Sequence, residues 1–227
     1  SGRSNDARSS QGQCSFALFE GTTDYGEMLI CDGANKPFFF KMTGTGALSD
    51  RTFFAGEITV DSTTAPTVGV IHENHFVVGG APTAKNKIFF SATLDPESFS
   101  GTGSGSIQLT DAIVGLASFR SDLIIFCKNS IFKLINISDS SNIAIVPITQ
   151  NVGCLDGNSI QEIGGDLLFL SPDGIRTVAG TARIGDVELS SVSRQIQKIT
   201  TTIANGINNF VITSGTLRSK SQYRLFY

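Results

Sequence analysis

The chain contains two histidines, and they stand close together at His72 and His75 in the segment HENH. Paired histidines bind zinc when they lie four residues apart on one helix, because both rings then point to the same side. Here the two are three residues apart in a segment that we expect to be a strand, where an odd spacing places side chains on opposite faces. We therefore expect polar residues at the end of a strand, and no metal site.

Other residues that could do chemistry lack the partners that the chemistry needs. Asp95 and Glu97 could form a carboxylate pair, but Pro96 separates them in a loop expected to be solvated, where nothing would raise either pKa. The glycine-rich residues 101–105 (GTGSG) precede a strand pattern, without the lysine or helix start of a phosphate-binding loop. Serine and cysteine nucleophiles lack a base, since both histidines are expected side by side in one strand. The sequence therefore predicts no catalytic residue, no cofactor and no metal, and so a protein that is not an enzyme.

The segment SPDG, residues 171–174, resembles the Asp-box turn of sialidase-type propellers. That box is itself a structural turn with a following aromatic residue, which is missing here, so we interpret the segment as a glycine-assisted hairpin turn. A sialidase-like site would also need arginines that converge from several blades. Arg176 and Arg224 fall within expected strands while Arg120 precedes one, so their registers differ.

The elements that would position such residues recur along the chain. Residues 115–135 (GLASFRSDLIIFCKNSIFKLI) hold two apolar runs around a polar turn, which is typical of a β-hairpin. The plan recurs at intervals of about 44 to 55 residues. The hairpin within residues 115–135 starts at Asp122, and further copies start at Glu27, Asn74 and Asp166. A fifth copy starts at Ser221, with its first strand only. One hairpin cannot hide this much apolar surface, so the copies must stack against one another.

A repeat of this length that carries strands is typical of a β-propeller blade of four strands. Such a blade has two apolar faces, and it covers them by packing between neighbours around an axis. A β-sandwich would also give short strands, but it predicts no plan repeated at one spacing. We therefore predict an all-β fold, a β-propeller with four to five recognisable blades and one short helix.

The segments between the hairpins predict further strands at residues 15–20, 51–60 and 142–149, with Gly56 as a possible bulge. Residues 95–106 predict a flexible loop that Phe99 anchors. The short helix is expected at residues 191–199, because Val192, Ile196 and Ile199 would share one face. We expect it to cover a sheet edge or to pack on the rim between repeats.

Composition and length agree with one large all-β domain. The chain has 227 residues, of which 40% are hydrophobic and 16% charged, which suits a compact core. Residues 1–13 are polar and predict an arm or loop, and residues 14–227 predict the propeller domain. The last strand would lack its hairpin partner, so we expect a segment of a longer chain whose propeller is incomplete at the C-terminal end.

Charge and cysteine usage limit the class of protein further. The net charge of −3 without a basic patch argues against a dedicated nucleic-acid groove, although nucleic acid could pass through a weakly acidic channel. Cys14, Cys31, Cys127 and Cys154 form no CxxC pair, and we expect free thiols that behave as small apolar residues in a protein made in a reducing compartment. No apolar run approaches the roughly 20 residues of a membrane helix, and no signal sequence opens the chain, so we expect no membrane-spanning segment.

Four segments in the middle half of the chain carry a family resemblance. They are residues 88–99 (IFFSATLDPESF), 113–135 (IVGLASFRSDLIIFCKNSIFKLI), 151–175 (NVGCLDGNSIQEIGGDLLFLSPDGI) and 193–199 (SRQIQKI). Together they resemble the propeller of tail proteins in tailed bacteriophages, and they are most similar to the tail nozzle, or tail tubular protein B, of short-tailed phages. This chain is much shorter than such nozzle proteins usually are, which agrees with a segment of a longer chain.

The resemblance implies a structural virion protein of the phage tail, in the nozzle or the head-to-tail connection. Such proteins commonly form a ring of six whose subunits line the channel through which DNA leaves. The resemblance further implies neighbouring tail proteins such as adaptor and fibres, genomic DNA that passes without specific binding, and assembly in the host cytoplasm. The family brings no catalytic residues.

The alternative is a carbohydrate-binding propeller that recognises a host surface. Such a protein needs exposed aromatic platforms. The chain has only 3 tyrosines and no tryptophan, which weighs against this alternative.

Overall fold

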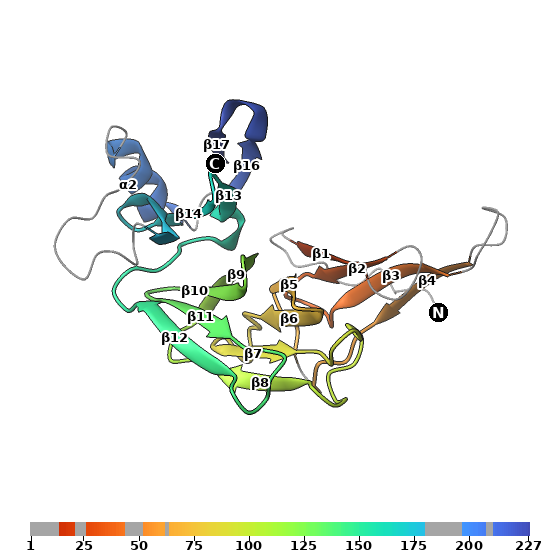
Figure 1. The fold of residues 1–227 in the computed structure, drawn as a ribbon. Helices are drawn as coiled ribbons and strands as arrows, with labels where there is room; N and C mark the ends of the chain where they lie inside the picture. The colour runs from red at the N-terminus through yellow and green to blue at the C-terminus, as the bar shows by residue number, and fades with distance from the viewer. Residues whose placement is uncertain (1–13, 21–25, 44–51, 62–63, 180–196, 208–210) are drawn as a thin grey trace. The chain divides into compact units, whose positions relative to one another are not determined.

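The computed structural model describes residues 14–20, 26–43, 52–61, 64–179, 197–207 and 211–227, and its described strands form five antiparallel sheets (Figure 1). Within every sheet, strands that follow one another along the chain pair with one another. The first sheet holds β1 (Ser15–Phe19), β2 (Glu27–Cys31), β3 (Phe38–Thr43) and β4 (Thr52–Glu57). The second holds β5 (Val68–His72), β6 (His75–Gly79), β7 (Lys87–Phe90) and β8 (Gly105–Gln108).

The third sheet holds β9 (Ile113–Phe119), β10 (Asp122–Cys127), β11 (Ile131–Ile135) and β12 (Ala144–Thr149). The fourth holds β13 (Gln161–Ile163), β14 (Asp166–Ser171) and β15 (Gly174–Thr177), and the fifth holds β16 (Thr213–Leu217) and β17 (Gln222–Phe226). Two short 3-10 helices, η2 (Gly157–Ser159) and η5 (Arg218–Lys220), and the helix α2 (Gln197–Asn205) lie between strands.

The predicted hairpins are present, and each occupies the same place in its sheet. They form the second and third strands of the first four sheets, as β2–β3, β6–β7, β10–β11 and β14–β15. The fifth copy, β17, pairs with β16 as β2 pairs with β1. The prediction of an all-β fold built from repeated antiparallel modules is therefore confirmed.

The first two strands of three consecutive sheets are joined by turns of two residues. The pairs that close these turns are His72 with His75, Phe119 with Asp122, and Ile163 with Asp166. Two-residue hairpin turns suit the twist of strands when their residues have positive φ angles. Glu73 and Asn74 have φ angles of 44° and 63°. The repeat thus extends to turns that the sequence reading did not use.

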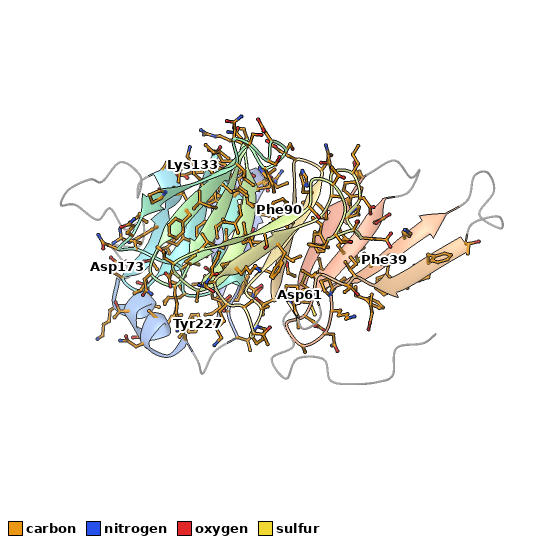
Figure 2. The ribbon with its side chains drawn as sticks, turned by 90° about the horizontal axis from the view of Figure 1, so that it is seen from below. Phe39, Asp61, Phe90, Lys133, Asp173 and Tyr227 are labelled. Atoms are coloured by element: carbon orange, nitrogen blue, oxygen red, sulfur yellow. The ribbon has the colours of Figure 1, made fainter. Side chains whose placement is uncertain are left out.

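The chain divides into two compact units, one formed by Ser1–Ala112 with Asn136–Ile143 and the other by Ile113–Ile135 with Ala144–Tyr227. In the first unit, one face of the first sheet packs on one face of the second sheet. Phe39, labelled in Figure 2, and Leu29 belong to the same buried cluster as Phe76, Val78 and Phe89. Phe99 packs against this cluster with its ring centroid 6.2 Å from that of Phe76, so the predicted anchor of the loop is confirmed.

In the second unit, strand β14 is buried on both faces because alternate side chains point to opposite sides. Leu167 and Phe169 join a cluster with Phe126 of β10, whose ring centroid lies 5.2 Å from that of Phe169. Leu168 and Leu170 join a second cluster with residues of β15, α2 and the segment before β16. The sheet that holds β14 therefore has apolar neighbours on each side.

The first strands of neighbouring sheets lie next to each other within each unit. In the first unit β1 contacts β5, and the hydroxyl of Ser15 both donates to the carbonyl oxygen of Gly69 at 3.0 Å and accepts from its N–H at 3.1 Å. In the second unit β13 contacts β16, and Nε2 of Gln161 donates to the carbonyl oxygen of Ser214 at 3.3 Å. Equivalent strands of successive sheets therefore come together.

Gly56 does not form the predicted bulge. It pairs regularly with Phe39 in the ladder between β3 and β4. The ring of Phe39 lies over the glycine, so a Cβ atom added there would come within 2.8 Å of the ring. The glycine is needed to make room for a cross-strand aromatic side chain, which sequence alone does not distinguish from a bulge.

The prediction of a helix at residues 191–199 was only partly right. Val192 and Ile196 lie outside the described residues, and the described helix α2 continues to Asn205. Ile199, expected on the packed face, is 50% exposed, while Thr200 and Ile203 are buried. Ile203 belongs to the cluster of Leu168 and Leu170, so α2 covers a sheet face instead of an edge.

We predict that Phe169→Ala lowers the free energy of unfolding by about 3 to 5 kcal/mol, because it leaves a cavity between two sheets of the second unit. Phe226→Ala, at an exposed aromatic residue, serves as the control and is expected to change it by less than about 0.5 kcal/mol. Chemical denaturation of both variants measures the difference. Equal stabilities of the two variants would contradict the packing described for β14.

Candidate functional site

The structure corrects the placement of the two histidines. His72 ends β5 and His75 begins β6, so the two are direct cross-strand partners and do not belong to one strand. Directly paired residues share a face of the sheet, so the expectation of opposite faces was wrong. The reason is the turn formed by Glu73 and Asn74, whose positive φ angles the sequence reading took for extended backbone.

His75 is completely buried, and the surrounding residues fix the orientation of its ring. Its Nδ1 lies 2.7 Å from the carbonyl oxygen of Ser91 and must donate, because a carbonyl oxygen only accepts. Its Nε2 lies 3.3 Å from the hydroxyl of Thr93 and 3.4 Å from that of Ser138. These contacts tie the turn of the second sheet to two loops.

The hydroxyls of Thr93 and Ser138 both lie near Nε2 of His75, as a nucleophile would lie near a base. The sequence reading, which left serine without a base, was wrong on this point, because Ser138 comes from a loop 63 residues further along. The hydroxyl of Ser138 also donates to Oε2 of Glu73 at the shorter distance of 3.1 Å. Its proton is therefore directed to a carboxylate, and the ring that would act as base is buried. The arrangement stabilises the loop better than it would support acyl transfer.

The expected solvated pair of carboxylates is not what the structure contains. Asp95 is exposed, as expected, but Glu97 is only half exposed and forms an ion pair with Lys41 of β3. The ammonium group of Lys41 also lies 3.6 Å from Oε1 of Glu27, a buried residue of β2. The loop after β7 is therefore fixed to the first sheet.

Burial raises the pKa of Glu27, although Lys41 acts in the opposite direction. Burial would lower the pKa of Lys41, but its hydrogen bonds with Glu97 and Glu27 and their charges raise it overall. Oε2 of Glu27 has no hydrogen-bond partner in the part of the chain that the structure describes. The ammonium group of Lys41 is thus shared by two carboxylates, those of Glu27 and Glu97, which ties β2, β3 and the loop after β7 together.

The SPDG segment forms the predicted hairpin turn, since Ser171 pairs with Gly174 around Pro172 and Asp173. The sequence did not predict that Asp173, labelled in Figure 2, would bind the side chain of Arg176, which is buried. Nε of Arg176 donates to Oδ1 of Asp173 at 2.8 Å, and a second bond joins its NH2 group to Oδ2. The guanidinium group of Arg176 is bonded within its own hairpin, so it does not point to a ligand site.

The remaining sequence candidates have structural roles. Residues 101–105 form a turn in which the Ser104 hydroxyl donates to the carbonyl oxygen of Gly101 at 2.6 Å. Arg120 donates to the carbonyl oxygen of Gly165 at 3.0 Å and joins the two-residue turns of the third and fourth sheets. Arg224 is exposed on β17. Within the described ranges, no group of three or more His, Cys, Asp or Glu side chains is arranged to hold a metal ion.

The outer face of the first sheet, which is the face turned away from Leu29 and Phe39, carries a group of neighbouring apolar side chains. Following the pairing across the four strands, one row joins Phe16, Ile30 and Phe38, and a second joins Leu18, Met28 and Phe40. A third row joins Met42 with Phe53. We call these eight residues the outer apolar face; on β4 the first row continues to the exposed Glu57 and the second to Ala55.

The outer apolar face is exposed in the structure. Phe16 is 64% exposed, Leu18 61%, Met28 46% and Phe53 62%, and the other four residues are half buried. The rings order one another, since Phe40 lies with its centroid 4.8 Å from that of Phe38 and 5.4 Å from that of Phe53. An exposed apolar patch of this kind is a candidate contact surface.

The sequence reading missed this face, although the signal was present. Residues 38–40 read as three consecutive phenylalanines, which suggests a strand covered on both sides. Residues 52–54 read the same way. Only the strand pairing shows that one of the two faces has its partner in the second sheet while the other remains exposed.

All four cysteines are free thiols, and Cys31, Cys127 and Cys154 are buried, as the sequence predicted for the two in strands. Burial raises the pKa of Cys154 to about 12 and also raises that of Cys31.

None of the helices in the described residues combines the length and apolar character that crossing a bilayer requires.

We predict that a thiol reagent at neutral pH modifies Cys14 first, because it is the one cysteine that is only partly buried. The native protein should show one fast equivalent, and unfolding in denaturant should raise the total to four. Cys14→Ser should abolish the fast phase. Rapid labelling of the native Cys14→Ser variant would contradict the burial of the other three thiols.

The pair of Asp173 and Arg176 should make stability depend on acid pH. The hydrogen bond from Arg176 lowers the pKa of Asp173 in the folded protein. A carboxyl whose folded pKa lies below its unfolded value, about 3.9, stabilises the fold fully above that value and loses this contribution as pH falls through the folded pKa.

We therefore expect Asp173→Asn to lower the free energy of unfolding by about 1 kcal/mol at pH 7, because the side chain of Asp173 is 43% exposed and solvent screens the pair. The difference from wild type should shrink as the pH falls below about 4. Urea denaturation at a series of pH values measures both quantities. A difference that stays constant down to about pH 2 would exclude this role for Asp173.

The four segments on which the predicted resemblance rests fall partly on strands and partly on loops of the structure. Residues 88–99 cover the end of β7 and the following loop, and residues 113–135 cover β9 to β11. Residues 151–175 run from the approach to η2 into β15, and residues 193–199 reach the start of α2, with 193–196 outside the described residues. No protein-family model matches the chain, and no curated protein matches it either.

Proposed function

We propose that this chain is a structural protein of a phage tail, part of a nozzle or head-to-tail connection, built on a β-propeller. It acts through shape and packing, without catalysis. Its sheets are blades around an axis, its subunits form a ring around the DNA channel, and its surface loops meet neighbouring tail proteins.

One observation carries this proposal: in three pairs of successive sheets, each within one unit, equivalent parts lie side by side. The first strands adjoin, as β1 with β5 and β13 with β16. The two-residue turns adjoin as well, as the bond from Arg120 to Gly165 shows for the third and fourth sheets. Repetition of one module with the same neighbours each time is what a radial array of blades requires.

The composition of the sheets supports a role in assembly. In β10, every residue from Leu123 to Cys127 is buried, so this strand is covered on both faces. The first sheet, in contrast, leaves its outer apolar face exposed. A protein whose function is to be one part of a particle needs such a face, because the particle supplies the cover.

The charge of the chain supports passage of DNA without retention. Lysine and arginine total 17 against 20 acidic residues. Binding to the phosphate backbone is driven by clustered basic side chains, and it strengthens with the number of phosphates that they neutralise. A weakly acidic wall gives DNA little to bind.

The resemblance of the four segments supplies the kind of particle. They follow one another in the order of consecutive blades, which makes the set more specific than any one segment. The proposal of a phage tail rests on this resemblance, while the proposal of a structural role rests on the sheets.

We expect an antibody raised against this chain to label phage particles at the tail in electron microscopy. Antibody that has been absorbed with the purified chain is the control and should leave particles unlabelled. Negatively stained images of the purified full-length protein should show rings. Absence of the protein from purified particles would refute the proposal, whereas binding to glycans on an array would favour the carbohydrate-binding alternative.

A further inference from the structure

The ammonium group of Lys41 on β3 is shared by carboxylates that compete for it. One is Glu27, the direct cross-strand partner of Lys41 on β2, and the other is Glu97 in the loop after β7, residues 91–104. Asp95 of the same loop adds a third negative charge that acts on Glu27. One positive charge therefore faces more negative charge than it can neutralise.

Glu27 is the carboxylate in the less favourable place. Its side chain is 7% exposed, against 30% for Glu97, which forms a hydrogen bond with Nζ of Lys41. Oε1 of Glu27 lies 3.6 Å from the same Nζ, and its buried Oε2 has no hydrogen-bond partner within the described ranges. A buried charged oxygen without a partner is costly, and a proton on the carboxyl group removes that charge.

Apolar side chains lie beside the charged cluster. On β1 the cross-strand partner of Glu27 is Phe19, and on β2 the next residue of the same face is Leu29. Lys41 lies over the ring of Phe39, with Nζ 4.9 Å from its centroid. The charges that act on Glu27 are therefore those of Lys41 and of the loop after β7.

We infer that a proton on Glu27 controls how firmly the loop after β7 is held on the first sheet. While Glu27 is ionised, it attracts Lys41 and repels Glu97, so the loop is held weakly. Once Glu27 is protonated, Lys41 pairs with Glu97 alone and the loop is held more firmly. The loop is also attached through Phe99, so the proton changes how often the loop opens and does not detach it outright.

The direction of the effect follows from what opening removes. In the closed state, burial and the two carboxylates of the loop raise the pKa of Glu27 above its ordinary value of 4.5, and opening takes those carboxylates away. A group whose pKa is raised in the closed state stabilises that state fully below its ordinary value, and this contribution is lost as pH rises through the raised pKa. The loop should therefore open more often as pH rises, the opposite of the dependence expected for Asp173. This response belongs to the chain itself and holds whether or not the chain is part of a phage tail.

Hydrogen exchange of backbone amides, expressed as protection factors between about pH 4.5 and pH 8, tests the inference. The amides of Ala92 and Leu94 report on the loop, because they donate to the carbonyl oxygens of Ser98 and Asn74 at 2.7 Å and 2.9 Å. We expect their protection in wild type to fall about fivefold over this range as Glu27 ionises. The amides of β10 are the reference and should keep their protection.

Glu27→Gln retains the shape of the protonated side chain and carries no charge at any pH. Its loop amides should be about fivefold better protected than those of wild type at pH 8, and their protection should not depend on pH. The matched control is Glu57→Gln, which removes an exposed carboxylate from β4 of the same sheet and should follow wild type. A variant that merely loosened the packing would lower the protection instead of raising it.

NMR of the side-chain carboxyl carbon follows the proton on Glu27 directly. The midpoint of its titration should lie above 4.5 in wild type and should fall in Glu97→Gln, because Lys41 then serves Glu27 alone. Loop protection that stays constant with pH in wild type, a Glu27→Gln loop that still loses protection as pH rises, or a midpoint that Glu97→Gln leaves unchanged would each overturn the inference. These results concern the loop alone, so the proposed function would stand.

Discussion

The structure depends on one constraint: strands such as β10 and β14 are apolar on both sides, so the sheets that hold them need two covered faces. Strand β14 shows this most clearly, because Leu167 and Phe169 point into one buried cluster while Leu168 and Leu170 point into another. Leaving either face in water would cost about 25 cal/mol for each Å² of apolar surface. Two sheets can satisfy only one face each, so modules of this kind are stable only in a series of sheets.

Polar side chains in such a series have a different task from those of an enzyme site. Ser15, His75, Arg176 and Tyr223 are each bonded to a neighbouring strand or loop, as in the bond that Tyr223 donates to the carbonyl oxygen of Ser159 at 2.8 Å. Because a buried polar group without a partner is costly, each bond holds its elements in one register. The bonds between Ser15 and Gly69 join two neighbouring sheets and favour one relative position, while those of His75 and Arg176 fix turns and loops next to their own strands.

The hairpins could be predicted because two apolar runs around a polar turn have few other interpretations. The turn at Glu73 and Asn74 could not, since neither residue is glycine and the left-handed backbone of both is visible only in three dimensions. The contact of Ser138 with His75 joins parts of the chain 63 residues apart, so no local sequence pattern predicts it. The predicted helix ended at Ile199, although its apolar spacing continues to Ile203. Sequence periodicity does not show which of these two isoleucines is packed.

Glycines stand where the narrow sides of neighbouring modules meet. Gly69 lies under the ring of Phe76 and beside the sulfur of Cys31, and the backbones of Gly115 and Gly157 approach each other with no side chain between them. At Gly115 and Gly157 the main chains come close, while at Gly69 the side chains of Phe76 and Cys31 fill the space that a Cβ atom would need. A larger residue at any of these positions would push neighbouring elements apart, so their close approach depends on the smallest residue type in the chain.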